Sequence, residues 1–202
     1  MGDVWNFMIN NFTRKKNNYV NYANKGMNLE NDINITNSYY RDTNIALVYK
    51  KATPIKIIKV DYNLARIKDA VFENPSTLDY SGVYKGIYLD FDAKECNSKT
   101  SFPISNIHTH QIKHIRNVLI HKGISFLVVR FNVLDKTFVL FGWDLLRFID
   151  NSNRKSIPYE YFLEYGVEIP IKYTPRVDYI RAIDKYITNM EVIYENKEKE
   201  RC

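Results

Sequence analysis

Residues 76–95, STLDYSGVYKGIYLDFDAKE, contain acidic and basic side chains at a spacing that can support chemistry. Asp79 stands before the two glycines of this segment, and Asp92 and Lys94 stand after them. Several carboxylates beside a single ammonium on one side of a strand pair would lose hydration, and the carboxylates would repel one another unless a bound metal cation compensated them. Oxygen ligands of this kind suit Mg²⁺, with Mn²⁺ as a substitute. The segment therefore predicts a divalent metal site.

The same segment predicts a β-hairpin, because it is rich in β-branched and aromatic residues and has glycines near its middle. A two-residue loop at 84–85 closes the hairpin most simply and places Asp79 opposite Asp90. Alternation by itself does not decide whether Asp90 or Asp92 binds the metal, because both point to the same side. The predicted polar face holds Thr77, Asp79, Asp90, Asp92 and Lys94, and the predicted core face holds Leu89, Phe91 and Ala93.

The order Asp79, hairpin, Asp92-x-Lys94 resembles the PD-(D/E)XK nuclease superfamily, although Pro75 is not adjacent to Asp79. Much more of the chain resembles the RecU family of Holliday-junction resolvases. This resemblance implies an α/β fold with a restriction-endonuclease-like core, in which helices flank a mixed β-sheet and a stalk projects at about residues 56–74. The ordered blocks that carry it are 24–40, 49–55, 78–95, 99–115, 153–160 and 175–180.

The resemblance also implies a role for each site residue. Lys94 would stabilise the transition state, and Asp79 and Asp92 would be catalytic. Glu30 would support them from the first helix, but an acid that stabilises the positive end of that helix is an equal alternative. Asp92 stands where the family usually has Glu, which is one methylene longer, and this difference bears on metal geometry and preference. The implied metal ligands are Thr77, Asp79, Asp92 and Gln111.

Basic and aromatic residues outside the hairpin are expected to contact DNA. Phe72 resembles a family aromatic near the base of the stalk, and burial in the core is its alternative. Arg66 is the nearest counterpart of a stalk arginine, although this sequence is a few residues shorter there. The full set of predicted DNA contacts is Lys50, Lys51, Arg66, Phe72, Lys99, Arg154 and Lys155.

The remaining pattern predicts the elements that position this site. Helices are expected over 27–42, over about 108–122, from 144 onward and after Pro175. The runs 124–132 and 136–143 are continuously apolar, which indicates strands of a sheet that is covered on both faces. Gln111 lies on the inward side of the second helix, where it must find a partner, either at the metal site or in nearby backbone.

Composition bounds the remaining possibilities. The 202 residues carry a net charge of +6 and a pI near 9.1, a mild basic bias that is consistent with a nucleic-acid partner. Two cysteines without metal spacing and no long apolar run indicate a reduced, cytoplasmic protein without a membrane segment. His110 and His114 lack the further ligands that zinc requires. We expect a basic arm at 1–24, a single nuclease domain at 25–190 and a charged, frayed tail at 191–202.

The resemblance implies metal-dependent, symmetric nicking of four-way DNA junctions by a homodimer, in recombination and repair. Recombinase and branch-migration proteins are further expected partners. Charge and spacing alone leave three alternatives open: another nuclease of the same superfamily, a non-catalytic junction-binding protein, and a basic protein without a nucleic-acid role.

Overall fold

A six-stranded mixed sheet forms the centre of the computed structural model, which describes residues 28–72 and 77–199. β5 and β7 pair in parallel, and the other neighbours pair antiparallel. The predicted arm at 1–24 lies outside the described residues. In spatial order the strands are β1 (Leu47–Lys50), β4 (Tyr80–Tyr84), β5 (Ile87–Cys96), β7 (Ile124–Phe131), β8 (Lys136–Phe141) and β10 (Val167–Glu168).

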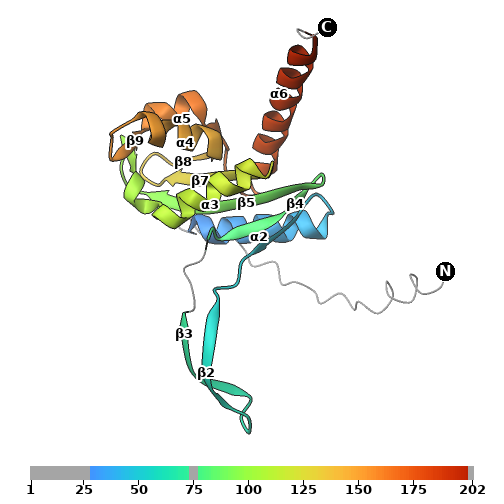
Figure 1. Cartoon of the computed structure of the whole chain (residues 1–202), viewed down its shortest axis with the longest axis vertical. Coiled ribbons are helices and arrows are strands. Elements are labelled where there is room, and N and C mark those ends of the chain that lie inside the picture. The colour runs from blue at the N-terminus through green and yellow to red at the C-terminus, as the bar shows by residue number, and fades with distance from the viewer. Residues whose placement is uncertain (1–27, 73–76, 200–202) are drawn as a thin grey trace, which may run out of the picture.

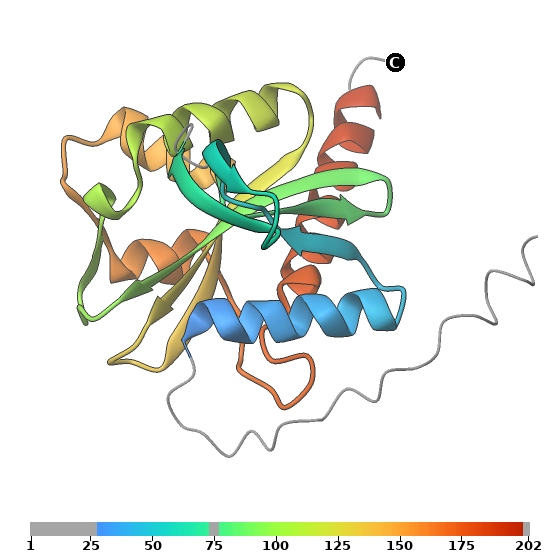
Figure 2. The ribbon, with the colours of Figure 1, turned by 90° about the horizontal axis from the view of Figure 1, so that it is seen from below.

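Helices cover both faces of this sheet, and Figure 2 shows α2 and α3 on opposite sides of it. One apolar core lies between the sheet and α2 and α6, and there Phe91 stacks on Tyr80 and Phe126 at 4.9 and 4.6 Å. A second core lies between the other face and α3, α4 and α5. The helices are α2 (Leu29–Asp42), α3 (Thr109–Ile120), α4 (Gly142–Asn151), α5 (Tyr159–Tyr165) and α6 (Tyr179–Lys199).

This mixed sheet with helices on both faces confirms the predicted α/β architecture. β7 is buried along its whole length, as a strand with both faces covered must be. The predicted core residues Leu89 and Phe91 are fully buried, and Ala93 is partly buried. α6 continues to Lys199 and so includes most of the segment expected to be a frayed tail. Among the described helices, none is long and apolar enough to cross a membrane.

The hairpin between β4 and β5 forms, but its predicted register is wrong by two residues. Tyr84 pairs with Ile87, so the loop residues are Lys85 and Gly86. Both have positive φ, 48° and 78°, which is the conformation of a type I′ turn, and glycine favours the second position of that turn. Tyr80 pairs with Phe91, and therefore the next positions along, Asp79 and Asp92, lie opposite each other.

Gly82 serves a different purpose from Gly86. A Cβ atom at Gly82 would lie 2.2 Å from the carbonyl oxygen of Leu47 on β1. Glycine is therefore required here because β1 and β4 approach closely, whereas the turn requires Gly86. The sequence could not distinguish these roles because β1 is distant along the chain.

The predicted stalk is a two-stranded hairpin that projects from the core (Figure 1). It consists of β2 (Ile55–Asp61) and β3 (Arg66–Phe72). β3 is exposed throughout, and β2 is exposed up to Lys59. A short second pair, β6 (Ser101–Pro103) with β9 (Ser156–Pro158), lies outside the main sheet, next to the 3-10 helix at Ile104–Asn106.

Candidate active site

Asp92 lies at the centre of a buried polar cluster on the face of β5 that is turned toward α3. Its side chain is fully buried. The Oδ2 atom accepts a hydrogen bond from Nε2 of Gln111 at 2.7 Å and lies 2.8 Å from Nζ of Lys94. The Oδ1 atom accepts from the backbone N–H of Ala93 at 2.8 Å. The structure thus brings together Asp79, Asp92, Lys94 and Gln111, as the sequence predicts.

The pKa of Asp92 is raised from its ordinary value of 3.8 to about 6. Burial is the largest cause, because it disfavours the charged carboxylate, and a side-chain hydrogen bond with Asp79 adds to it. Lys94 acts in the opposite direction and lowers this pKa. When both acids are ionised, two neighbouring carboxylates and one ammonium leave an excess of negative charge, which suits a cation.

The raised pKa predicts that Asp92 makes the folded chain less stable as pH rises. The folded state holds this proton more tightly than the unfolded state, so the stabilisation is complete below about pH 4 and is lost as pH rises through about 6. The loss corresponds to about 3 kcal/mol. Asp92→Asn should therefore raise the free energy of unfolding at about pH 8 and change it little at about pH 4, as measured by urea denaturation in a chelator. Equal effects at both pH values would contradict this prediction.

Asp90 shares the face of Asp92 but is occupied by other partners. It is fully buried, and both of its oxygens accept hydrogen bonds from Nζ of Lys51, at 2.9 and 2.8 Å. The hydroxyl of Tyr88 donates to Oδ2 at 2.6 Å, and Nε2 of His114 lies 3.0 Å from the same atom. Asp90 is therefore satisfied by protein groups, whereas Asp92 faces the second carboxylate. This contrast favours Asp92 as the metal ligand.

Gln111 is buried and lies on the inward side of α3, as its spacing predicts. Its Oε1 accepts a hydrogen bond from the backbone N–H of His108, which completes a capping box at the start of α3. Its Nε2 donates to Asp92. In this arrangement Gln111 holds the carboxylate in place, and its carbonyl oxygen serves the helix cap.

Two predicted site residues lie beside the cluster and contact lysines. The hydroxyl of Thr77 accepts from Nζ of Lys51 at 3.0 Å. The Glu30 carboxylate forms an ion pair with Lys50, and both side chains are about half exposed. Lys51 was expected to contact DNA, but its side chain turns inward to Asp90 and Thr77. Thr77 is thus linked to Asp90 through Lys51, whereas the Glu30 and Lys50 pair lies on the surface.

The other predicted DNA contacts lie on the surface. Phe72 is 80% exposed at the base of the stalk, so its alternative assignment to the core is wrong. Arg66 begins β3 at the far end of the stalk and is exposed. Lys99, Arg154 and Lys155 are also exposed, and they flank the paired strands β6 and β9. The structure leaves all of these side chains accessible to a ligand.

The donor set fits a hard divalent cation better than zinc. In the part of the chain that the structure describes, no three His, Cys, Asp or Glu side chains are grouped to hold a metal. Mg²⁺ needs fewer protein ligands, because it is commonly bound by one or two carboxylates and completes its shell with water and substrate phosphate oxygens. The adjacent Asp79 and Asp92 meet that requirement.

Sequence reasoning missed the partners of Asp90. Lys51 comes from the segment after β1, Tyr88 from β5 itself and His114 from α3. Tyr88 stands two residues before Asp90 on the same strand, so alternation could have placed both side chains on one face. Lys51 and His114 are distant from Asp90 in sequence and gave no such local signal. His114, for which the sequence excluded only a zinc site, contacts this buried carboxylate.

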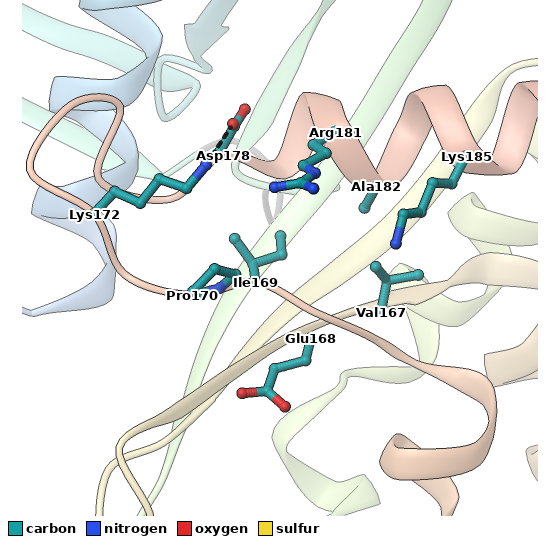
Figure 3. Close-up of a pocket in the computed structure, with 9 residues that line it drawn as sticks. All are labelled: Val167, Glu168, Ile169, Pro170, Lys172, Asp178, Arg181, Ala182 and Lys185. Carbon is teal, nitrogen blue, oxygen red and sulfur yellow. Dashed lines mark hydrogen bonds and ion pairs between the residues drawn. The ribbon is translucent and has the colours of Figure 1, made fainter.

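A separate pocket with a volume of about 270 Å³ lies between β10 and α6. Figure 3 shows Arg181 and Lys185 on α6, above Val167 of β10. The pocket also contains the Lys172 and Asp178 ion pair. Its lining includes none of the predicted site residues, so it is distinct from the carboxylate cluster.

Comparisons with known proteins bear on this arrangement. The model of the family RecU, described as Recombination protein U, matches residues 24–185. The chain is 48% identical over 172 residues to the Holliday junction resolvase RecU of Geobacillus thermodenitrificans (strain NG80-2), which covers 82% of this chain and 86% of the relative. It is 47% identical over 169 residues to the protein of the same name from Bacillus thuringiensis (strain Al Hakam), with coverage of 81% and 84%.

A solved structure is also similar to part of the chain. It is that of Hjc, a Holliday junction resolvase from Archaeoglobus fulgidus, with a TM-score of 0.38 and 9% sequence identity. The match covers 65% of this chain and 93% of that chain.

Proposed function

Since this chain belongs to the RecU family of recombination proteins, we propose that it resolves Holliday junctions by hydrolysing phosphodiester bonds in two strands at the crossover. The observation that supports this most directly is the buried Asp92, which lies beside Asp79 and 2.8 Å from the Lys94 ammonium. Paired carboxylates with an adjacent ammonium suit metal-assisted hydrolysis of a phosphate ester.

Asp79 and Asp92 would hold Mg²⁺ or Mn²⁺. The Thr77 hydroxyl and Gln111, the other two predicted ligands, would join them only if their oxygens left Lys51 and the backbone N–H of His108. When bound, such an ion polarises the scissile phosphate and lowers the pKa of a bound water molecule. Gln111 and the backbone N–H of Ala93 fix the Asp92 carboxylate, so the ligand is oriented before substrate arrives.

Lys94 would stabilise the charge that develops on the phosphoryl oxygens. Its side chain is 20% exposed, and its ammonium contacts buried Asp92. An ammonium in a partly desolvated site interacts more strongly with developing charge than one in bulk water. We assign Lys94 the role of transition-state stabiliser, and Glu30 a supporting role through its ion pair with Lys50.

The junction would be bound by the stalk and by the basic surface around the site. Arg66 lies toward the tip of the stalk and Phe72 lies at its base, where an exposed ring can stack on an unpaired base. Lys50, Lys99, Arg154 and Lys155 are exposed and can contact phosphates.

We further propose that two copies of the chain associate through the uncovered face at the β1 edge of the sheet. Leu47 and Val83 pair across β1 and β4 and are 54% and 45% exposed, and Tyr49 on the same face is 53% exposed. An apolar patch of this kind on an edge strand marks an interaction surface. A two-fold dimer would present two sites to the two equivalent strands of a junction.

Leu47→Asp is expected to convert such a dimer to a monomer, because it introduces a charge into the proposed apolar contact. Size-exclusion chromatography with light scattering measures the change, and Leu64→Asp, an exposed leucine on the stalk, is the matched control for oligomeric state. A parent protein that is monomeric, or a Leu47→Asp variant that remains dimeric, would contradict the proposed interface.

The function itself is tested with purified protein on a mobile four-way junction, with Mg²⁺ or Mn²⁺, beside a linear duplex of the same sequence. We expect symmetric nicks in the junction and little cleavage of the duplex. Equal cleavage of the duplex would indicate another kind of nuclease. Tight junction binding without cleavage in either metal would indicate a binding protein, and failure to bind DNA at moderate salt would remove the nucleic-acid role.

A further inference from the structure

Lys51 connects the two segments at the base of the stalk. It lies between β1 and β2, where the chain enters the stalk, and its backbone N–H donates to the carbonyl oxygen of Asp79 at 2.7 Å. Its Nζ donates to the hydroxyl of Thr77 at 3.0 Å. Thr77 and Asp79 follow the stalk in the chain, so this one lysine joins the entering segment, 51–54, to the leaving segment, 77–79.

The same ammonium is bound to the strand that carries Asp92. It donates to both oxygens of Asp90 on β5, at 2.9 and 2.8 Å, and the Asp90 side chain is fully buried. Because a buried carboxylate without its cation is strongly unfavourable, this pair resists separation far more than a surface ion pair would. The base of the stalk is therefore anchored to β5.

Helix α3 also contacts both Asp90 and Asp92. Gln111 contacts Asp92, and His114, about one helical turn later, contacts Asp90. The two carboxylates thus belong to one packed unit, in which Asp92 serves the proposed metal site and Asp90 receives Lys51. Asp90 and Asp92 are two positions apart on β5, so a shift of the stalk base that moved Asp90 would also move Asp92.

We propose that Lys51 is a positioning residue that couples the stalk to the active site. By holding Thr77, Asp79 and Asp90 together, it fixes the base of the stalk relative to Asp92, so that a junction gripped by the stalk is presented to the site in one geometry. This inference rests on the proposed function. A misplacement of the reacting groups by about 1 Å can cost about 10²-fold in rate, which makes such an anchor consequential.

The test is Lys51→Met, which keeps the length of the side chain and removes the ammonium. We expect the single-turnover cleavage rate at saturating protein to fall about 10- to 100-fold, the range typical of residues that orient a ligand. The Kd for the junction, measured without divalent metal, should be unchanged. Amide hydrogen exchange at 77–80, measured without DNA, should become faster. Lys136→Met is the matched control, because Lys136 forms an exposed ion pair with Glu168 at the far side of the sheet.

Lys51→Arg should recover part of the rate, since it restores the cation. If Lys51→Met does not fold, the double variant Lys51→Met with Asp90→Asn removes the buried unpaired charge, and the same measurements apply to it. A parental cleavage rate in whichever variant folds would overturn the proposal. So would a weaker Kd with an unchanged rate at saturation, which would make Lys51 a DNA contact. Unchanged exchange at 77–80 would overturn it even if the parent protein cleaves no junction.

Discussion

Replacing Asp92 by asparagine is expected to lower the rate of junction cleavage by about 10³-fold, because metal stabilisation of the transition state is worth several kcal/mol. Asn keeps the shape of the side chain and an oxygen for the Gln111 hydrogen bond, but it removes the charge that would hold the cation. Junction binding should not weaken, since the carboxylate repels phosphate. The measurement is single-turnover cleavage, together with Kd in the absence of metal.

Asp92→Asn separates loss of the metal ligand from unfolding of the protein. The raised pKa of Asp92 predicts that Asp92→Asn is more stable than the parent above about pH 6, so inactivity would not come from unfolding. Asp150→Asn is the matched control, because Asp150 forms an exposed ion pair with Arg116. If Asp92→Asn cleaved at the parental rate, Asp92 would not be the ligand. If the same substitution at Asp90 removed activity while the protein stayed folded, the assignment of the two acids would need to be reversed.

Replacing Lys94 by methionine is expected to lower the cleavage rate by about 10²- to 10³-fold, the usual effect of removing one group aimed at developing charge. Junction binding should be spared, because one ammonium in a partly buried site contributes little to contacts spread over the stalk and the surrounding surface. Single-turnover rates at saturating metal measure this change.

A second consequence of Lys94→Met concerns pH. Lys94 lowers the pKa of Asp92 in the metal-free protein, so its removal should raise that pKa further and, at subsaturating metal, move the acidic limb of the pH–rate profile to higher pH. Lys136→Met again controls for the loss of one lysine. A lower rate with an unmoved acidic limb would separate Lys94 from Asp92, and a loss of junction affinity equal to the loss of rate would make Lys94 a phosphate contact.

The resemblance to the RecU family implies glutamate at the position of Asp92. Aspartate at this position is shorter than glutamate, and here it is reached by Gln111 at 2.7 Å and Lys94 at 2.8 Å. The short side chain keeps the carboxylate close to β5, within contact of its own strand through the N–H of Ala93. The contacts with Gln111, Lys94 and Ala93 therefore orient the aspartate, although its side chain is one methylene shorter than that of glutamate.

The sequence by itself determined the composition of the two faces of β5. Alternation along 87–96 assigned Asp90, Asp92 and Lys94 to one side and Leu89 and Phe91 to the other, and the structure has this arrangement. The continuous apolar run at 124–131 similarly predicted a strand covered on both sides. These features follow from local backbone geometry, because successive side chains in a strand point in opposite directions whatever the strand pairs with.

The tertiary structure alone decided which groups meet. The positive φ angles of Lys85 and Gly86 set the hairpin register and brought Asp79 opposite Asp92, whereas the predicted loop paired Asp79 with Asp90. Lys51 and His114 then satisfied Asp90 from distant segments, which left Asp92 as the acid beside Asp79. Strand register and side-chain burial depend on contacts between residues far apart in the chain, so they are set only when the strands and helices pack. Local periodicity therefore cannot predict them.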